Sequence, residues 1–545
     1  MRRLLPAAAL VGALVAVPST ASGARAFTYG VSAAEVTPTS ALLWAHAVKS
    51  GKVRIVVALD RRFTKGRVTK TLAATKANDL TVQARVRGLT PGRRYRYYFI
   101  QGRQRSLIGA FTTAPKPTAA KTIRFAVTGD ADGIRTGGQN YWNKDGANNF
   151  ATYDAMTREK NDFNVNLGDT MYSDAGTSLG FARAFTLAQK RAKYKLGLSY
   201  PKLVALRQSG AVYNQWDDHE FVDDFNRHSE GCDVGSIFTD GYACDIGAIW
   251  KAGVKAFREY MPVTYSAQNG TYRTFRWGKN LQIFILDERS FRSLRASEVK
   301  KDPSAAEPTA HVCDTAGNDD VAPRIPQRLR NTFALLYPAL ATPIAPECLA
   351  ALNDSKRTML GTRQYNAFTS AIRKSTAKWK VIVNEVPMME FGINPYDDWE
   401  GYEHEREKLL TFLKNTVKNV AIVTTDFHTN WVNDARIKTW PEDGGPVPSG
   451  VKEFIGGGVA DDLFGHEIDG VTGQADTWKL IDGAFLNQAP PNGPGMECSN
   501  MVTYGYIQVE ASASSLKVVL KDNTGKQMTN SADGKPCGPW VLPAK

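Results

Sequence analysis

The stretch "VYNQWDDHEF", Val212 to Phe221, places four ionisable side chains directly after an apolar, strand-like run. Other apolar runs in the chain end in the same way, in side chains that can bind a metal ion or a phosphate group. In an open α/β sheet, ligands bind beyond the carboxyl ends of the strands. We therefore expect these side chains to meet at one edge of a sheet. They are Asp130 and Asp132 of "TIRFAVTGDAD", Asp169 and Tyr172 of "FNVNLGDTMYSD", Asp217, Asp218, His219 and Glu220 of the first stretch, Asp287 and Arg289 of "LQIFILDERSFR", Asn384 and Glu385 of "WKVIVNEVPM", and Asp426 and His428 of "NVAIVTTDFHTNW".

Such a set of carboxylates favours a metal site. Like-charged carboxylates raise one another's pKa and resist joint ionisation unless a cation lies among them. Oxygen ligands with one or two imidazoles suit Ca²⁺, Mn²⁺, iron or Zn²⁺, and two such ions can activate a water and hold a phosphoryl oxygen. A single Asp after a strand is more often a helix cap or a turn residue. The ordered set, which includes two of the chain's seven histidines, favours metals instead.

Length and composition describe a folded chain with an excess of positive charge. Its 545 residues predict two or three domains. A hydrophobic content of 43% and a charged content of 22% are ordinary for a globular protein. The formal net charge is +14, and a positive field attracts phosphate esters, nucleic acids and acidic lipid surfaces. Alternatively, the excess of Lys and Arg only keeps the protein soluble, and this explains the net positive charge equally well.

Residues 1–26 predict a secretory signal. Arg2 and Arg3 precede an apolar stretch, and "ARA" ends just before Phe27, where we expect cleavage and a mature net charge of +11. The alternative is a membrane anchor, which the short apolar stretch disfavours. No later segment is long and apolar enough to cross a bilayer. We expect a monomer that is secreted or held at the cell surface or in the periplasm.

The cysteines predict disulfide bonds. Their number is even, which favours pairing in an exported chain, and none lies in a C-x-x-C pair that would suggest zinc. Sequence does not determine the pairing. Pairing between neighbours along the chain would join Cys232 with Cys244, Cys313 with Cys348, and Cys498 with Cys537.

The chain divides into two parts. Residues 27–115 hold short alternating strands, and "LTPGRRYRYYF" is typical of a fibronectin type III-like β-sandwich. After a Pro/Ala/Lys linker, residues 122–545 alternate strands with helical segments such as "NNFATYDAMTREK" and "EHEREKLLTFLKNTV", which predicts a layered α/β domain. The Pro-rich segment 293–356 is too long for a plain connection, so we expect loops around a functional face.

The motifs resemble those of the calcineurin-like metallophosphoesterase superfamily, which runs Asp-x-His, Gly-Asp, Gly-Asn-His-Asp/Glu, a middle His, and Gly-His-x-His. They are most similar to the PhoD-like alkaline phosphatase and phosphodiesterase family. The matching pieces are "NLGDTMY", "WDDHEF", "FILDERSFR", "LGTRQ", "WKVIVNEVPM", "VTTDFHTNW" and "GYIQVE". This resemblance covers the mature chain. It implies a layered α-β-β-α catalytic domain preceded by the β-sandwich.

The resemblance also implies roles for particular residues. Asp169 would bridge two metals, and Tyr172 would be a phenolate ligand to a ferric ion. His219 would protonate the leaving oxygen or stabilise the phosphoryl group, and Arg289 would bind substrate phosphate. The remaining metal ligands would be Asp130, Asp218, Asp426 and His428.

Three departures from the family pattern bear on the metals. Asp130 stands where PhoD-like enzymes commonly have a cysteine, and this change from a thiolate to a harder carboxylate ligand admits Ca²⁺ or Mn²⁺ beside Fe³⁺. Asp132 replaces the first-motif histidine, and the middle histidine is absent, with Asn384 or Glu385 nearby. Asp223 or Asp224 could supply the missing ligand. We expect two or more metal ions, calcium and iron, with manganese and zinc as alternatives.

The predicted function is a secreted metal-dependent hydrolase of phosphate esters that uses metal-activated water. Monoesters and diesters are both open, and the family includes phospholipase D-like activity. One alternative is a non-catalytic secreted Ca²⁺-binding or adhesion protein, which the retained His219 beside Asp218 disfavours. Another is an exported nuclease with a basic, aromatic groove. A sandwich strand explains "RRYRYYFIQGRQR" better, so we expect no stable nucleic-acid partner.

Overall fold

The computed structural model describes residues 27–132, 150–174, 183–232, 243–302, 304, 311–315 and 318–545. The predicted signal peptide lies outside these ranges. In this part of the chain, no helix is long and apolar enough to cross a membrane.

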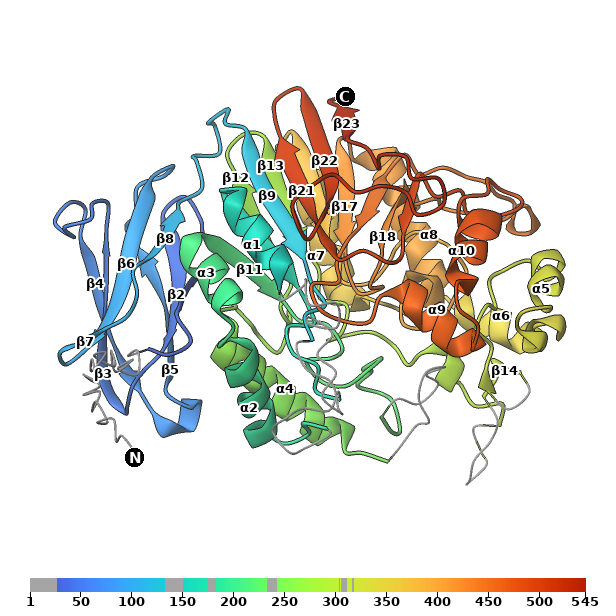
Figure 1. Cartoon of the computed structure of the whole chain (residues 1–545), viewed down its shortest axis with the longest axis horizontal. Coiled ribbons are helices and arrows are strands. Elements are labelled where there is room, and N and C mark those ends of the chain that lie inside the picture. The colour runs from blue at the N-terminus through green and yellow to red at the C-terminus, as the bar shows by residue number, and fades with distance from the viewer. Residues whose placement is uncertain are drawn as a thin grey trace, which may run out of the picture.

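The N-terminal strands form a β-sandwich (Figure 1). Along β6, the aromatic side chains of Tyr95, Tyr97 and Phe99 are buried in the core, and the residues between them face outward. This alternation is what a strand with one buried face requires. One sheet contains β1 (Val31–Ala34), β2 (Ser40–His46) and β5 (Thr81–Arg87), and the other contains β4 (Val68–Ala74), β3 (Gly51–Ala58), β6 (Arg94–Gln101) and β7 (Gln104–Arg105), with β8 (Gly109–Thr112) also on β6.

The first of these sheets continues into the rest of the chain, residues 116–545, because β1 pairs in parallel with β11. The result is one nine-stranded sheet in the order β23-β22-β21-β9-β10-β11-β1-β2-β5. The predicted boundary near residue 115 stays a prediction, since hydrogen bonds between strands join the two parts. The added strands are β9 (Ile123–Thr128), β10 (Phe163–Leu167), β11 (Ala211–Gln215), β21 (Gly505–Ala511), β22 (Ser515–Asp522) and β23 (Trp540–Pro543).

A second, seven-stranded sheet packs against the first, in the order β12-β13-β16-β17-β19-β18-β20. Its strands β13, β16, β17 and β19 are parallel to one another. The strands are β12 (Arg273–Trp277), β13 (Leu281–Ile285), β16 (Trp379–Val383), β17 (Val420–Thr424), β18 (Asn430–Asp434), β19 (Lys452–Ile455) and β20 (Cys498–Asn500), and a separate pair is β14 (Asp314–Thr315) with β15 (Asn318–Asp319).

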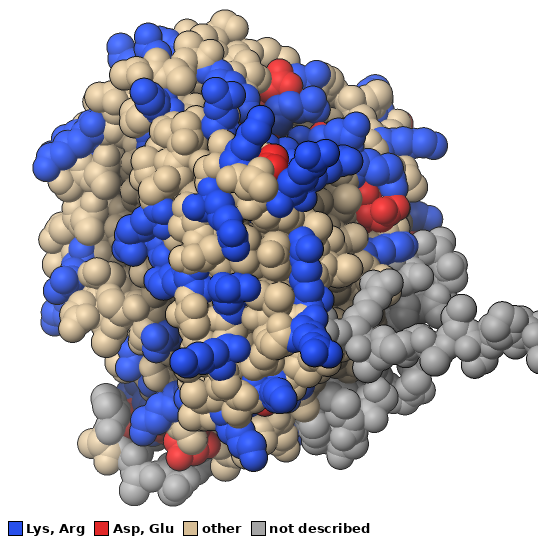
Figure 2. All heavy atoms as spheres, turned by 90° about the vertical axis from the view of Figure 1, so that its left-hand side faces the viewer, with Lys and Arg blue, Asp and Glu red and all other residues tan. Residues whose placement is uncertain are grey.

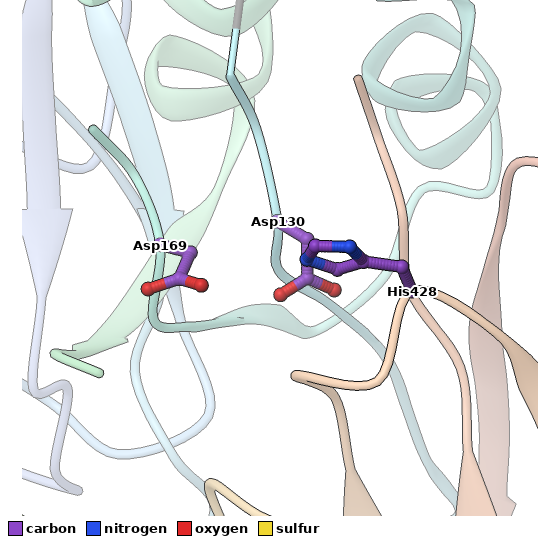
Figure 3. Close-up of side chains that lie close together, drawn as sticks. All are labelled: Asp130, Asp169 and His428. Carbon is purple, nitrogen blue, oxygen red and sulfur yellow. The ribbon is translucent and has the colours of Figure 1, made fainter. Parts of the chain in front are cut away.

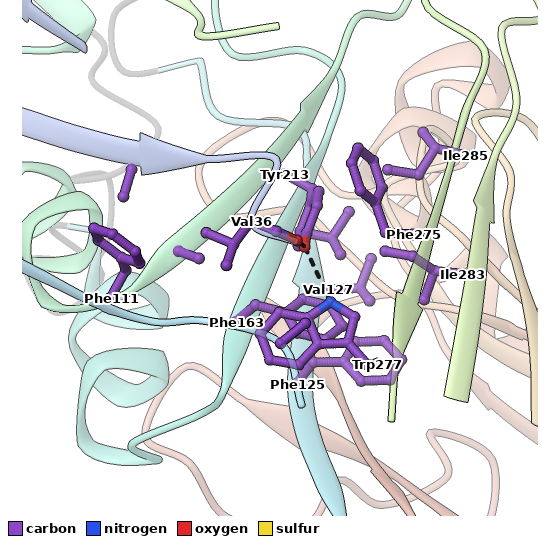
Figure 4. Packing of buried hydrophobic residues seen from close by; sticks show 14 of the residues in the cluster. Val36, Phe111, Phe125, Val127, Phe163, Tyr213, Phe275, Trp277, Ile283 and Ile285 are labelled. Carbon is purple, nitrogen blue, oxygen red and sulfur yellow. Dashed lines mark hydrogen bonds between the residues drawn. The ribbon is translucent and has the colours of Figure 1, made fainter. Parts of the chain in front are cut away.

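The main core lies between the two sheets (Figure 4). The ring centre of Phe163 on β10 is 4.7 Å from that of Trp277 on β12 and 4.8 Å from that of Phe125 on β9. The indole of Trp277 donates a hydrogen bond to the Tyr213 hydroxyl (3.0 Å), which donates to the carbonyl of Val36 (2.6 Å). Because β10, β11, β16 and β17 are buried along their whole length, both sheets are covered on their other faces as well.

Helices supply the outer layers, so the expected α-β-β-α order is confirmed. α1 (Ala151–Arg158) and α3 (Pro201–Ser209) cover the first sheet, and α7 (Gly361–Lys374) and α8 (Glu403–Thr416) cover the second. The other helices are α2 (Leu187–Gly197), α4 (Ile246–Tyr260), α5 (Gln327–Phe333), α6 (Pro346–Leu352), α9 (Phe464–Thr472) and α10 (Thr477–Ile481), with shorter helical turns at Lys76–Asn78, Ala296–Glu298, Pro338–Ala341, Trp399–Tyr402, Pro441–Asp443 and Asp482–Leu486.

Segment 293–356 differs from the plain loops expected. It contains α5 and α6, which bury Leu329, Arg330, Cys348 and Leu352. The disulfide between Cys313 and Cys348 holds the segment together. All three expected pairings are confirmed, since Cys232–Cys244 and Cys498–Cys537 are the other two bonds.

Candidate metal centre

The site lies at the carboxyl ends of strands from both sheets, as expected. Asp130 follows β9, Asp169 follows β10, and Asp426 and His428 follow β17. All four backbones are left-handed, with φ of 54°, 49°, 76° and 46°. Few residues other than glycine adopt this conformation, and such residues cluster at functional sites.

A first group of possible metal ligands joins Asp130, Asp169 and His428 (Figure 3). One ligand atom from each lies within 4.8 Å of the others. The Asp130 carboxylate accepts hydrogen bonds from the backbone N–H groups of Asp426 (3.3 Å) and Gly458 (3.1 Å). The Tyr172 hydroxyl is buried 3.0 Å from Nε2 of His428. Four of the predicted metal-binding residues therefore lie together.

A second group joins Asp169, Asp218 and His219 within the same 4.8 Å limit. Asp169 belongs to both groups, which is the position that a carboxylate bridging two metal ions must occupy. A third group joins Asp217, Asp218 and Asp426. Because these groups share Asp169 and Asp218, and Tyr172 contacts His428, all six predicted metal-binding residues belong to one connected cluster.

Several buried carboxylate oxygens in these groups accept no hydrogen bond from the described residues. They are Oδ1 of Asp169 and Oδ2 of Asp217, and also Oδ1 of Asp218, which lies 3.3 Å from the Arg289 guanidinium. A buried polar atom without a partner costs free energy, more so when it carries charge. Hard cations prefer such oxygen ligands, so the residues present fit a metal cluster.

Burial and mutual repulsion raise the carboxylate pKa values in the protein without metals. The pKa of Asp130 rises to about 6 because of burial, against the opposing effect of His428. Burial and neighbouring acids hold the pKa values of Asp169 and Asp426 well above the usual range. Burial and the charge of Asp461 likewise hold the pKa of Tyr172 well above 10. A bound cation would reverse these shifts, because it favours the ionised forms.

Arg289 lies completely buried (0% exposed) among the acids at the ends of β11 and β17. Its guanidinium is 2.6 Å from a carboxylate oxygen of Asp397, 3.3 Å from one of Asp218 and 3.6 Å from one of Asp426. Its Nε donates to Asp217. The positive charge of Arg289 therefore offsets part of the negative charge of the acids in the third ligand group.

His219 is positioned through its second ring nitrogen. Nδ1 lies 2.8 Å from the carboxylate of Asp174, and Nε2 lies 3.5 Å from Asp223. Burial alone would lower the pKa of His219, but Asp174, Asp218 and Asp169 together raise it well above 6.5. The contact of Asp174 with Nδ1 fixes the orientation of the imidazole.

Glu220, the last acid of the opening stretch, ties the loops together. Its carboxylate accepts hydrogen bonds from the backbone N–H groups of Asp169 (3.1 Å), Thr170 (2.9 Å) and Asp217 (2.8 Å). A side chain at Gly168 would place Cβ 2.4 Å from Cβ of Asp217, so only glycine allows this close approach. The Gly-Asp pair and the Asp-Asp-His-Glu stretch are thus parts of one packed unit.

Some residues of the site were missed by sequence reasoning. Asp461 lies 3.2 Å from Nε2 of His428, and Glu467 lies 3.3 Å from its Nδ1. Asp461 follows β19 only after the run "GGG", so it comes later after its strand than the other acids, and a wider search for acids after apolar runs could have found it. Asp174 and Asp397 lie in loops with no comparable signal.

Other candidates are placed elsewhere. The carboxylate of Glu385 accepts hydrogen bonds from Gln215 and from the backbone of Glu288, and it belongs to no ligand group among the described residues. The side-chain oxygen of Asn384 accepts a hydrogen bond from the Trp399 indole. The two acids offered for the missing ligand do belong to such groups, Asp223 with Asp174 and His219, and Asp224 with Asp218 and Asp397.

Comparison with known proteins identifies relatives along most of the chain. Alkaline phosphatase D of Bacillus subtilis is 24% identical over 449 residues, which are 75% of this chain and 66% of that protein, just under two thirds of its length. A solved structure of PhoD is 20% identical, covers 94% of both chains and has a TM-score of 0.66. A purple acid phosphatase from yellow lupin seeds is 12% identical, covers 92% of this chain and 73% of that one, and has a TM-score of 0.55.

Family models match both parts of the chain. The model of the N-terminal domain of PhoD-like phosphatases matches residues 13–115. The model of the PhoD-like phosphatase itself matches residues 133–520, which is more than half of the sequence. The chain therefore belongs to the PhoD-like phosphatase family.

Proposed function

We propose that this protein is a metal-dependent hydrolase of phosphate esters. The observation that carries the proposal is the position of Asp169, which is shared by two groups of ligands and whose buried Oδ1 accepts no hydrogen bond from the described residues. Two metal ions held there would supply an activated water and neutralise the phosphoryl oxygens. Membership of the PhoD-like phosphatase family supports the same chemistry.

The ligand groups support a division of the residues between two metals. Asp130, His428 and Tyr172 would hold one ion, Asp218 and Asp426 the other, and Asp169 would bridge them. Tyr172 as a phenolate suits iron, and the oxygen-rich second group suits calcium. Manganese and zinc are the alternatives, because Asp130 offers a carboxylate where a thiolate is common in the family.

His219 would give its Nε2 proton to the leaving alcohol oxygen. Asp174 supports this role because it binds Nδ1 and leaves Nε2 as the remaining donor.

Arg289 stays a predicted substrate-phosphate ligand. Its complete burial and its carboxylate partners favour instead a role in balancing the charge of Asp217, Asp218 and Asp426.

The chemistry of the site identifies the substrate as a phosphate ester and does not distinguish monoesters from diesters. Monoesters and diesters, including phospholipase D-like cleavage, use the same metals and the same attack at phosphorus. We also propose that residues 1–26 direct export of the protein and that the mature protein is a monomer. The three disulfides are consistent with an oxidising compartment.

The deciding experiment combines metal analysis of the purified mature protein with hydrolysis of a chromogenic monoester and a chromogenic diester. We expect at least two metal ions per chain and turnover of one or both substrates. Asp169→Asn should lose both metal and turnover, whereas Asp154→Asn on the exposed side of α1 should lose neither. Wild-type protein that binds no metal and cleaves neither ester would contradict the proposal.

A further inference from the structure

The positive charge of the protein is concentrated in the N-terminal sandwich. Residues 27–115 contain 16 Lys and Arg against three Asp and Glu, a net charge of +13. Residues 116–545 contain 49 basic and 51 acidic side chains, a net charge of −2. Lys and Arg that served solubility alone would have no reason to collect in one part of the chain.

The acids of the sandwich do not neutralise this charge. Glu35 is buried at the junction with the catalytic part, and Asp79 pairs with Lys195 of α2. Asp60 accepts hydrogen bonds from Thr64 and from the backbone of Lys65. Within the described ranges, Arg85 is the one basic residue of these 16 with a carboxylate at ion-pair distance.

Strand geometry places much of the charge on one surface. Because Tyr95, Tyr97 and Phe99 point into the core, Arg94 and Arg96 on the same strand point outward. The same alternation on β3 exposes Lys52 and Arg54, and register places Arg54 and Arg105 on either side of Ile100. We call this surface the basic sheet face; it consists of Lys52, Arg54, Arg94, Arg96 and Arg105.

Figure 2 looks onto this end of the molecule and shows Lys and Arg spread across it with few Asp or Glu. The turn between β3 and β4 adds Arg61, Arg62, Lys65 and Arg67, all exposed. Eleven of the sandwich's 16 basic residues are arginines. The planar guanidinium binds phosphate oxygens in pairs, which an ammonium group cannot do.

The aromatic side chains of this surface are not available for stacking on bases. The guanidinium of Arg105 lies 3.6 Å from the ring centre of Tyr98, and the Phe63 ring packs edge-on against Tyr98 at 4.7 Å. Phe63 is only 7% exposed. Proteins that bind single-stranded nucleic acid combine a basic groove with exposed rings. A broad sheet face with covered rings fits a flat anionic surface better.

We propose that the basic sheet face and the adjoining turn dock the protein on an anionic phospholipid bilayer. Lipid phosphates would contact the outward arginines over a broad area, without insertion of apolar side chains. Such binding is electrostatic, so it requires anionic lipid and weakens as salt screens the charges. This goes beyond the proposed function, since it concerns a surface of the sandwich and not the metal centre.

The test is co-sedimentation of the full mature protein with vesicles of phosphatidylglycerol and phosphatidylcholine, with pure phosphatidylcholine vesicles as the neutral comparison. We expect binding to the anionic vesicles alone. Reversing four charges, with Lys52→Glu, Arg54→Glu, Arg61→Glu and Arg62→Glu, should weaken it roughly a hundredfold or more. The matched control reverses four exposed lysines of the catalytic part, Lys251, Lys374, Lys418 and Lys517, and should change it little.

Each result decides the proposal. Wild-type protein that fails to bind anionic vesicles overturns it, and so does an equal loss in the two quadruple variants, which would mean that only total charge matters. Binding to a DNA oligonucleotide at the same salt, with no binding to vesicles, would replace the bilayer by a nucleic acid. The melting temperature and the hydrolysis of a small chromogenic ester should be the same in both variants, which separates docking from folding and from catalysis.

Discussion

At the scale of single residues, the site depends on how each side chain is held. His219 has one nitrogen on Asp174, and Asp130 accepts two backbone N–H groups. Glu220 accepts hydrogen bonds from the backbone N–H groups of Asp169, Thr170 and Asp217, and so holds the loops that carry Asp169 and Asp217. Such supporting contacts determine the orientation of metal ligands and catalytic groups.

The first prediction concerns Asp174 as the residue that positions His219. Asp174→Asn should lower kcat by roughly tenfold to a hundredfold and leave metal content unchanged, because the imidazole loses its charged partner. The loss should be larger for an alkyl phosphate than for a nitrophenyl phosphate, whose leaving group needs little protonation. Kinetics with both substrates and metal analysis provide the measurement.

A double variant makes this prediction more specific. If Asp174 acts through His219, adding Asp174→Asn to His219→Ala should cost nothing further, since residues that act as a unit are non-additive. Equal losses with both leaving groups, or additive losses in the double variant, would show that Asp174 only supports the loop.

At the scale of elements, the strand ends behind the site are joined by a pair of buried acids. Glu288 follows β13 and Glu385 follows β16. The backbone N–H of Glu288 donates to the carboxylate of Glu385 (2.8 Å), and that of Glu385 donates to the carboxylate of Glu288 (2.7 Å). Burial raises the pKa of Glu288 to about 8, and burial with the charge of Glu288 holds that of Glu385 well above its usual range.

The second prediction follows from these raised pKa values. A carboxyl group whose pKa is higher in the folded state contributes stability below its unfolded pKa, near 4.5, and loses it as pH rises through about 8. Glu288→Gln should therefore flatten the decrease in unfolding free energy between about pH 5 and pH 8. Urea unfolding at several pH values, with excess metal, measures this slope. Glu230→Gln at an exposed position is the control, and an unchanged slope for Glu288→Gln would refute the prediction.

At the scale of the whole molecule, the sandwich and the catalytic part share one sheet and one core. Glu35 lies at their junction, 1% exposed. Its carboxylate accepts a hydrogen bond from the backbone of Thr264 (2.7 Å), pairs with Arg85, and lies 3.5 Å from Arg273 of β12. The indole of Trp44 also donates to the carbonyl of Glu259 across this junction (2.6 Å). The two parts should therefore unfold together.

The third prediction tests this coupling. Glu35→Ala should destabilise the protein by about 3 kcal/mol, because it leaves the buried Arg273 and the half-buried Arg85 without their carboxylate partner. Thermal unfolding should stay a single transition by both fluorescence and calorimetry. Asp60→Ala, in an exposed turn of the same sandwich, should have a small effect. Two separate transitions in the wild-type protein would mean that the sandwich is an independent unit.

The sequence alone predicted most of the strands and helices and the candidate metal ligands. Period-2 alternation identified the sandwich strands, and acids after apolar runs identified the metal-binding candidates, because both are local patterns. The site's supporting residues were not predictable in this way: Asp174 and Asp397 carry no motif, and the burial of Arg289 among acids depends on loops far apart in the chain. The joining of sandwich and catalytic part through β1 and β11, and the collection of arginines on one sheet face, were likewise decided only by the tertiary structure. Partners distant in sequence are chosen by packing, which no local pattern contains.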